Sequence, residues 1–396
     1  MQSSGPLSGI RVIDFGRFIA GPYCAMLLAD MGADVIRIDR RQGSEDRYLT
    51  PVAATGEGTS FLSLNRNKRS LTLDLAKPQA SEVVQRLVRT ADVVVVNLPI
   101  EVLKKAGLDY DALKAIKSDI IFARISTFGP DGPYSKKVGF DAVAQAMTGA
   151  MHLTGFPGPP VRSVVPFEDY GTALHTAFGV VVALYHRSQS GEGQIVDTAL
   201  LSTGITFMQT ILAERQVLGI ERRQTGNTSF YAAPADCYRA CDGWIMVSIV
   251  GNEMFARWAR LVGHHEFISD PRFVGDQRRA DNNAAITGAM NIWLSSRTTA
   301  QAIAELEAAR IPAGPVLDPG QVLADPQVKA RRLLQEVEFP GAPAPIPLAS
   351  PAVTLSATPP KIRHRAPMLG EHTGQILEEL GYSKAEIANL RKAEAV

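Results

Sequence analysis

The sequence predicts an α/β fold with a large Rossmann-like domain and a smaller α+β domain. Through the first 200 residues, short β-branched runs alternate with helix-length amphipathic segments, the pattern of a parallel sheet covered by helices. The chain has 396 residues, of which 45% are hydrophobic and 20% charged, which is enough for two or three domains with real cores.

Four strands of the sheet are apolar almost throughout, as strands buried on both faces must be: Arg11–Phe15, Asp34–Ile38, Asp92–Val96 and Asp119–Ala123. Helices are expected between them at Ala20–Met31 and from Pro78 to about Arg89. A longer helix from Tyr170 to about Ser188 repeats apolar residues at helical spacing, and we expect most of it to be buried.

A strand at 194–199 and a helix over about 201–218 complete the large domain, which we assign to residues 1–220. The smaller domain is assigned to 225–325, with strands at Gly243–Ile249 and Ile311–Val316 and helices at about 251–262, 281–296 and 299–309. Residues 326–365 are expected to be an extended linker, because their second half is rich in Pro and Ala, and a final helix is expected at Thr373–Leu380.

The composition excludes several classes of partner. Lys plus Arg total 41 and Asp plus Glu total 40, so no basic excess attracts nucleic acid. The three cysteines, Cys24, Cys237 and Cys241, are too few and too scattered for a disulfide framework or a zinc site, which predicts a reducing, cytoplasmic location and no metal. The chain opens on no signal-peptide pattern and has no apolar run long enough to span a bilayer, so no membrane partner is expected.

Familiar cofactor and hydrolase motifs are missing. The segment Phe15–Pro22 after the first strand is not Gly-x-Gly-x-x-Gly, and neither a P-loop nor a Gly-x-Ser-x-Gly elbow occurs. What remains is a set of basic and amide residues near strand ends: Arg37, Arg40, Arg41, Asn67, Lys68, Arg69, Asn97, Lys136 and Lys137. Surface charge explains any one of them, but their joint position at the ligand-binding edge of a parallel sheet suits a polyphosphate ligand.

Asp169 directly precedes the long apolar helix. Its simplest role is that of an N-cap, because aspartate accepts the free backbone N–H groups at a helix start. The helix dipole also keeps a carboxylate ionised, and an ionised carboxylate facing a cleft is a competent nucleophile for an activated acyl group. The two roles are compatible, and the residues alone leave both open.

Segments along nearly the whole chain resemble the class III CoA-transferases, a family that also contains the α-methylacyl-CoA racemases. They are Leu7–Phe15, Ala20–Cys24, Gly32–Asp39, Asn67–Leu75, Gly129–Tyr134, Asp169 followed by Thr172 and Ala173, Gly191–Gln194 and Ala366–Thr373. The resemblance implies that residues 338–396 complete the large domain, that the small domain is inserted between, and that two chains interlock as a homodimer.

The resemblance also implies the chemistry. Asp169 would be the catalytic residue, forming mixed-anhydride and aspartyl-CoA thioester intermediates as CoA passes from a short-chain acyl-CoA donor to a free carboxylic acid. Coenzyme A would lie along the large domain, with Arg40 and Lys137 near its phosphates, Asn97 and Lys105 near its nucleotide, and Lys68 or Arg69 adding charge.

Two positions in the first βα turn depart from the family's formyl-CoA transferases, which carry His and Gln where this chain has Arg17 and Ile19. A glycine-rich loop of those enzymes is also missing after Asn227. Both departures disfavour formate and oxalate as substrates. Arg17 instead suits the second carboxylate of a short dicarboxylic acid, held by a bidentate contact.

Two alternatives remain. Racemases of the family pair the aspartate with a histidine in a Gly-His-Asp segment, since moving an α-proton between faces needs two acid/base groups. Here Phe140 replaces that histidine, which favours CoA transfer, and the following Asp141 either positions Asp169 or caps a second helix. The other alternative is a CoA-binding protein without catalysis, which would keep the basic residues but would not need Asp169.

Overall fold

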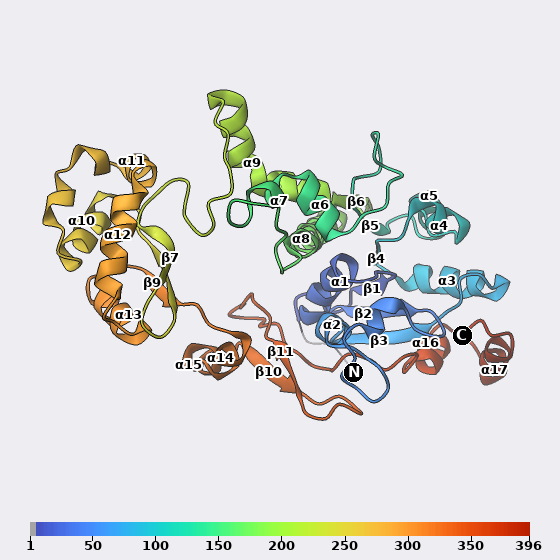
Figure 1. Ribbon diagram of the computed structural model, residues 1–396. Helices are drawn as coiled ribbons and strands as arrows, with labels where there is room; N and C mark the ends of the chain where they lie inside the picture. The colour runs from blue at the N-terminus through green and yellow to red at the C-terminus, as the bar shows by residue number, and fades with distance from the viewer. Residues whose placement is uncertain (1–4) are drawn as a thin grey trace. The chain divides into compact units, whose positions relative to one another are not determined.

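A computed structural model describes residues 5–396, which form two compact units (Figure 1). The first unit combines the residues up to Thr148 with Ser163–Leu212 and Gln327–Val396, and the second combines Gly149–Arg162 with Ala213–Pro326. The second unit therefore includes 149–162 and 213–220, which the sequence pattern assigns to the large domain.

The first unit is built on a six-stranded parallel sheet with the order β3-β2-β1-β4-β5-β6. Its strands are β1 (Arg11–Asp14), β2 (Asp34–Asp39), β3 (Lys68–Thr72), β4 (Val93–Val96), β5 (Ile121–Ser126) and β6 (Ile195–Ala199). The sheet confirms the α/β class. The sequence pattern does not predict β3 because the strand opens on two charged residues, Lys68 and Arg69, whose carboxylate partners lie in β1 and β2.

Helices cover both faces of this sheet. Successive residues of a strand face opposite sides, so neighbouring residues of β1 belong to two different cores. Val12 belongs to the core beneath α1 (Ala20–Asp30) and α8 (Phe167–Ser190). Ile13 belongs to the opposite core, beneath α3 (Pro78–Thr90), α16 (Thr373–Glu379) and α17 (Lys384–Lys392). The C-terminal helices therefore pack on the large unit, and α17 adds to the elements that the sequence predicts.

Shorter elements fill the connections of the first unit: η1 (Glu45–Tyr48), α2 (Thr59–Leu64), α4 (Ile100–Lys105), α5 (Tyr110–Ile116) and α6 (Asp141–Met147). The expected linker at 326–365 is not extended throughout. It holds α15 (Pro326–Ala330) and an antiparallel pair formed by β10 (Leu334–Val337) and β11 (Ile346–Ala349). Three of the prolines that suggest a linker lie in the turn between these strands, at 340, 343 and 345.

The second unit contains an antiparallel sheet of β7 (Ala235–Arg239), β8 (Trp244–Ser248) and β9 (Ala313–Pro315). Its principal helices, α10 (Asn252–Leu261), α12 (Asn283–Leu294) and α13 (Thr299–Ala308), enclose a separate core around the fully buried Trp258. Shorter helices are α7 (Ala150–Leu153), α11 (Asp276–Asp281), α14 (Pro319–Ala324), η2 (His265–Ile268) and η3 (Pro271–Phe273). The helix α9 (Leu200–Leu218) runs from the first unit into the second.

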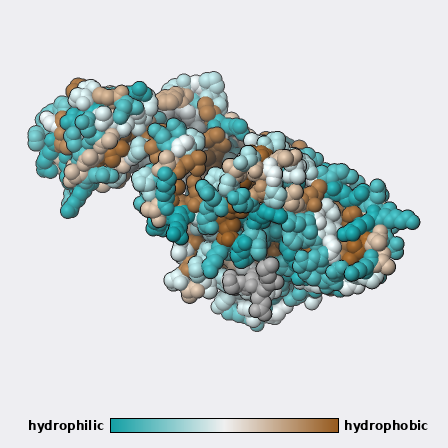
Figure 2. Space-filling view, turned by 90° about the horizontal axis from the view of Figure 1, so that it is seen from below, coloured by the Kyte–Doolittle hydropathy of each residue, from teal (hydrophilic) through white to brown (hydrophobic). Residues whose placement is uncertain are grey.

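Within its own chain, α8 is not mostly buried, contrary to the expectation from its apolar sequence. One side of α8 packs against the sheet with small residues such as Ala173 and Ala177. The other side exposes five apolar residues to between 45% and 71%: Leu174, Phe178, Val181, Val182 and Tyr185. A helix that is apolar on all sides is predicted to be buried, but only one side of it can contact the sheet of its own chain. Apolar surface is also visible as brown areas among teal ones in Figure 2.

Candidate active site

The side chain of Asn97 joins two loops at the carboxyl ends of β1 and β4. Its Oδ1 accepts from the backbone N–H of Arg17 at 2.8 Å, and its Nδ2 donates to the Arg17 carbonyl at 2.7 Å. The strand order reverses between β1 and β4, and open parallel sheets bind ligands at such a point. Both polar groups of Asn97 are therefore engaged in shaping the loop at this edge.

Arg17 lies in that loop. Its Nη1 donates to the carbonyl oxygens of Gly16 and Ile38 at 2.9 and 3.1 Å. Burial lowers the pKa of Arg17, and the nearby Arg37 adds to the lowering. None of the described residues accepts a hydrogen bond from Nη2.

Phe18 and Ile19 connect the same loop to α1 and to α6. Phe18 has a φ of 60°, which is unusual for phenylalanine, and its N–H donates to Asp46 at 3.2 Å. Its ring packs edge-on against Phe140, with 5.4 Å between ring centroids. Ile19 is half-buried at the N-cap of α1. The structure thus brings the turn residues next to the segment that precedes Asp141.

Asp169 is the third residue of α8 and is not its N-cap, which corrects the simplest role. The helix begins at Phe167, and the cap position is Pro166, which makes no side-chain cap. The carboxylate of Asp141 at the start of α6 acts instead: its Oδ1 accepts from the N–H groups of Glu168 and Asp169 at 2.9 and 3.2 Å. A carboxylate from another helix thus satisfies free donors of α8.

The electrostatic environment of Asp169 is that of a reactive carboxyl. Burial raises the pKa of Asp169 to about 7, and the charge of Asp141 adds to the rise. Desolvation combined with a defined charge partner is typical of functional groups. A carboxylate with a raised pKa is a stronger nucleophile once it has lost its proton.

Glu168 is a second perturbed carboxyl, and the sequence analysis missed it. The residue is 0% exposed, its Oε1 lies 2.8 Å from the Thr148 hydroxyl, and its Oε2 has no hydrogen-bond partner among the described residues. Burial raises the pKa of Glu168 to about 7, and the charges of Asp141 and Asp169 add to the rise. The hydrogen bond with Thr148 lowers this pKa but does not offset the effect of burial. The signal available in the sequence was a glutamate directly before the candidate nucleophile.

The geometry of Lys68 does not support its expected role in binding CoA. The residue is only 2% exposed, and its ammonium donates to Asp14, to the Pro22 carbonyl and to Asn65 at 2.8, 2.8 and 2.9 Å. An ammonium has three N–H donors, so none remains for a phosphate. The sequence shows the lysine but not the buried aspartate that tertiary structure sets against it.

Three other expected CoA residues lie in segments that follow β2, β4 and β5. Arg40 pairs with Glu45 at 3.1 Å, and its side chain is 62% exposed. Lys137 lies 4.0 Å from the centroid of the Tyr134 ring, and Lys105 is exposed at the end of α4. Exposed charges of this kind have weak local partners and remain available to an anionic ligand.

A cavity of about 860 Å³ lies at the opposite, amino-terminal ends of β1, β2 and β3. Arg69 lines it, but its guanidinium already donates to Asp34 and Glu379, and Arg11 contacts the same two carboxylates. Arg69 therefore lies away from the carboxyl edge of the sheet, and its geometry does not support the expected contact with CoA.

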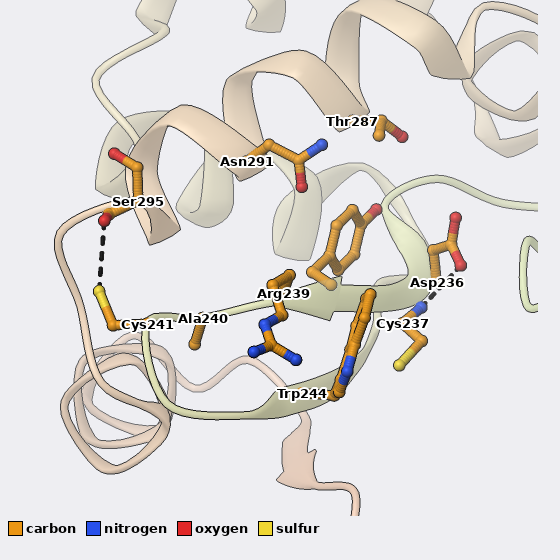
Figure 3. Close-up of a pocket in the computed structure, with 10 residues that line it drawn as sticks. Asp236, Cys237, Arg239, Ala240, Cys241, Trp244, Thr287, Asn291 and Ser295 are labelled. Carbon is orange, nitrogen blue, oxygen red and sulfur yellow. Dashed lines mark hydrogen bonds between the residues drawn. The ribbon is translucent and has the colours of Figure 1, made fainter.

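The second unit has a cavity of about 470 Å³ beside β7 and β8 (Figure 3). The guanidinium of Arg239 lies 5.3 Å from the centroid of the Trp244 ring on its wall. Burial raises the pKa of the Cys237 thiol, which favours the unreactive form. The carboxylate on the wall, Asp236, accepts from the Thr228 hydroxyl and from the backbone N–H of Cys237. We find no activated nucleophile among these lining residues.

Within residues 5–396, no cluster of three or more His, Cys, Asp or Glu side chains is arranged to hold a metal ion. None of the helices over the same range is both long and apolar enough to cross a bilayer.

Comparisons with known proteins agree with one another. The chain matches the family model described as CoA-transferase family III over residues 7–373. A succinyl-CoA–D-citramalate CoA-transferase of Chloroflexus aurantiacus is 33% identical over 99% of this chain and 98% of its own. A succinate–glutarate CoA-transferase of Agrobacterium fabrum is 33% identical over 95% of this chain and 96% of its own. Among solved structures, a CAIB/BAIF family protein from Brucella suis matches with a TM-score of 0.84 and 32% identity, covering 95% of this chain and 100% of that chain.

Proposed function

The chain belongs to CoA-transferase family III, and we propose that it moves CoA from the thioester of one short dicarboxylic acid, such as succinyl-CoA, to a second dicarboxylic acid. Relatives named for succinyl-CoA, citramalate and glutarate support this substrate class. Arg17 supports it too, because its Nη2 group, which binds none of the described residues, suits the carboxylate that does not react.

Asp169 is the nucleophile in this proposal. The observation that carries it is the bond from the Asp169 N–H to Asp141, which leaves the Asp169 side chain free of a capping role. Burial at the start of α8 then raises the pKa of Asp169 to about 7, so a substantial fraction is ionised at neutral pH. No second acid/base group is needed for transfer of an acyl group.

The cycle consists of four displacements at carbonyl carbon. An Asp169 oxygen attacks the donor thioester, the C–S bond breaks, and a mixed anhydride and CoA thiolate form. The thiolate attacks the aspartyl carbonyl, so the donor acid leaves as a carboxylate and CoA is held as a thioester on Asp169. The acceptor carboxylate attacks that thioester, the C–S bond breaks to release CoA thiolate, and a second anhydride forms. The returning thiolate attacks the acceptor acyl carbon, releasing the new acyl-CoA and the Asp169 carboxylate.

The other residues hold and orient the reactants in this proposal. Arg40, Lys105 and Lys137 follow different strands at the carboxyl edge and would contact the phosphates and nucleotide of CoA. The strand order also supports the description of the large domain as Rossmann-like. Asn97 contributes by fixing the backbone of Arg17, whereas Lys68 and Arg69 are left out of the proposed contacts because their donors are taken.

Racemisation is disfavoured by the side chain at position 140. Phe140 is 61% exposed and rests against Phe18, so it offers neither an acid nor a base opposite Asp169. A racemase would need a second proton-transferring group there.

We also propose a homodimer, interlocked as the family resemblance implies, that buries the apolar side of α8. Its exposed residues recur at helical spacing, from Leu174 through Phe178 to Tyr185. A contiguous apolar face of this kind is typical of an interface.

The test of the proposed function is incubation with succinyl-CoA and a panel of labelled mono- and dicarboxylic acids. The expected result is label in the acyl-CoA product, a CoA-sized adduct on the peptide containing Asp169, and loss of both in Asp169→Ala. Transfer that persists undiminished in Asp169→Ala would refute the mechanism. Exchange of an α-proton without acyl exchange would indicate a racemase instead.

A further inference from the structure

Glu168 lies next to the nucleophile, and the reaction described above does not use it. Its carboxyl group is enclosed by α6 and α9: Thr148 contacts Oε1 at 2.8 Å, and a Cβ added at Gly204 would come within 2.4 Å of the same oxygen. The absence of a side chain at Gly204 is therefore what gives the carboxyl group its space.

The hydrogen bonds around Thr148 indicate where the proton lies. The Thr148 hydroxyl is 2.8 Å from Glu168 Oε1 and 3.3 Å from the backbone carbonyl oxygen of Gln145. Neither oxygen carries a hydrogen if Glu168 is ionised, and a hydroxyl has only one hydrogen to donate. Both contacts are satisfied together if Glu168 donates from Oε1 to Thr148 and Thr148 donates to Gln145.

The other carboxyl oxygen agrees with this assignment. Glu168 Oε2 is buried without a hydrogen-bond partner among the described residues. An unpartnered oxygen of a neutral acid costs less than an unpartnered oxygen of a buried carboxylate. The charged groups that face Glu168 are Asp141 from α6 and Asp169 from its own helix, both acidic, while α9 contributes Gly204, which carries no charge.

We propose that Glu168 is a positioning residue that works as a neutral carboxylic acid: through Thr148 it ties the first turn of α8, with Asp169, to α6 without placing a second negative charge beside the nucleophile. The effect of Glu168 on the reaction rests on the proposed function, in which Asp169 is the nucleophile. The two species that attack the acylated Asp169 in the cycle, the CoA thiolate and the acceptor carboxylate, are both anionic, and a neighbouring negative charge would repel them.

The consequence is a two-sided pH profile. Asp169 must lose a proton to react, so the rate rises with pH as the first of the two carboxyl groups ionises. Loss of the second proton adds the unwanted charge, and the rate falls again at higher pH. The two groups are adjacent and titrate as a pair, so each limb reports an apparent value of the pair.

The variant that separates this role from simple packing is Glu168→Gln, which keeps the shape and is neutral at every pH. We expect its profile to lose the alkaline fall, so that at pH 8.5 its kcat/KM for the acceptor exceeds that of the wild type by on the order of tenfold. Glu307→Gln, at an exposed carboxylate of α13, is the matched control for charge removal and should follow the wild type. An alkaline fall in Glu168→Gln equal to that of the wild type would overturn the proposal.

A second measurement does not depend on activity. The infrared spectrum of the unliganded protein at pH 6 should contain carbonyl bands of protonated carboxylic acids. One of them should be lost in Glu168→Gln and kept in Glu307→Gln, while the band of protonated Asp169 remains in both variants. No difference between wild type and Glu168→Gln would overturn the neutral assignment. If the wild type transferred no CoA, the proposed function would fail, and the infrared result would still decide the state of Glu168.

Discussion

The backbone N–H of Asp169 donates to the carboxylate of Asp141 at 3.2 Å, so the residue proposed as nucleophile is held by a neighbouring helix through its backbone. One Asp141 oxygen serves as the cap of α8, and the other accepts from Gln145, whose own Oε1 accepts from the Ser163 N–H. Asp141 thus fixes where α8 begins, and its charge also raises the pKa of Asp169.

Asp141→Asn should separate these two effects. The amide oxygen can still accept from the α8 backbone, but the negative charge is gone, so the pKa of Asp169 should fall. We expect the acid limb of kcat/KM to move to lower pH by on the order of one unit. Asp141→Ala should instead lower the free energy of unfolding by about 1 kcal/mol through loss of the cap. An unchanged acid limb in Asp141→Asn would argue against Asp169 as the ionising group.

The free energy of unfolding should depend on pH through Asp169, and Asp169→Asn should remove that dependence. The pKa of Asp169 is about 7 in the folded chain and 3.8 for an aspartate exposed to water, so between these values the folded state holds more protons than the unfolded state. Stability contributed by this group is therefore present below pH 4 and is lost as pH rises toward 7. We expect Asp169→Asn to be more stable than the wild type at pH 8 and similar at pH 4, as measured by denaturant unfolding. A difference that is constant over this range would contradict the raised pKa.

Lys68→Met should reduce stability without weakening CoA binding. Removing the ammonium leaves the carboxylate of Asp14 buried without its ionic partner, and breaking a buried pair from one side costs about 3 kcal/mol. We expect a lower free energy of unfolding and an unchanged KM for acyl-CoA at a temperature where the variant is folded. Lys137→Met is the contrasting variant, since an exposed lysine should affect KM and leave stability unaltered. A raised KM in Lys68→Met would return Lys68 to the CoA site.

Arg17→Met should change substrate preference. Its guanidinium is held by carbonyl oxygens through Nη1, and the opposite side would hold the second carboxylate of a dicarboxylic acid. Loss of a charge-assisted pair should raise KM for a dicarboxylic acceptor by about tenfold and leave KM for a monocarboxylic acceptor nearly unchanged. Steady-state kinetics with matched four-carbon acids measures this, and equal effects on both acceptors would remove Arg17 from the specificity pocket.

Phe178→Asp should weaken self-association. Phe178 is 71% exposed in the centre of the apolar side of α8, and a carboxylate there would have to be desolvated in an interface. We expect sedimentation to shift from dimer toward monomer with the fold retained. Glu192→Asp, at an exposed site just beyond the end of α8, is a control. A wild type that sediments as a monomer at all concentrations would contradict the proposed interface.

Local patterns in the sequence determined the fold class, and the family resemblance carried by segments along the chain implied the candidate nucleophile. Apolar runs such as Val93–Val96 specify buried parallel strands because both faces of those strands must be covered. The segment around Asp169 is recognisable because its neighbours in the chain are the residues that the resemblance depends on. Patterns formed by residues close together in the chain can be recognised without knowing the fold.

Tertiary structure alone decided the roles that depend on pairs distant in the sequence. Lys68 meets Asp14 across 54 positions, and Asp141 caps a helix that begins 26 positions later. The charge state of a buried carboxyl such as Glu168 depends on the groups that enclose it and on the exclusion of water. The burial of Glu168 and its contacts arise only when α6, α8 and α9 pack together. In the sequence alone, this glutamate cannot be told from an ordinary surface charge.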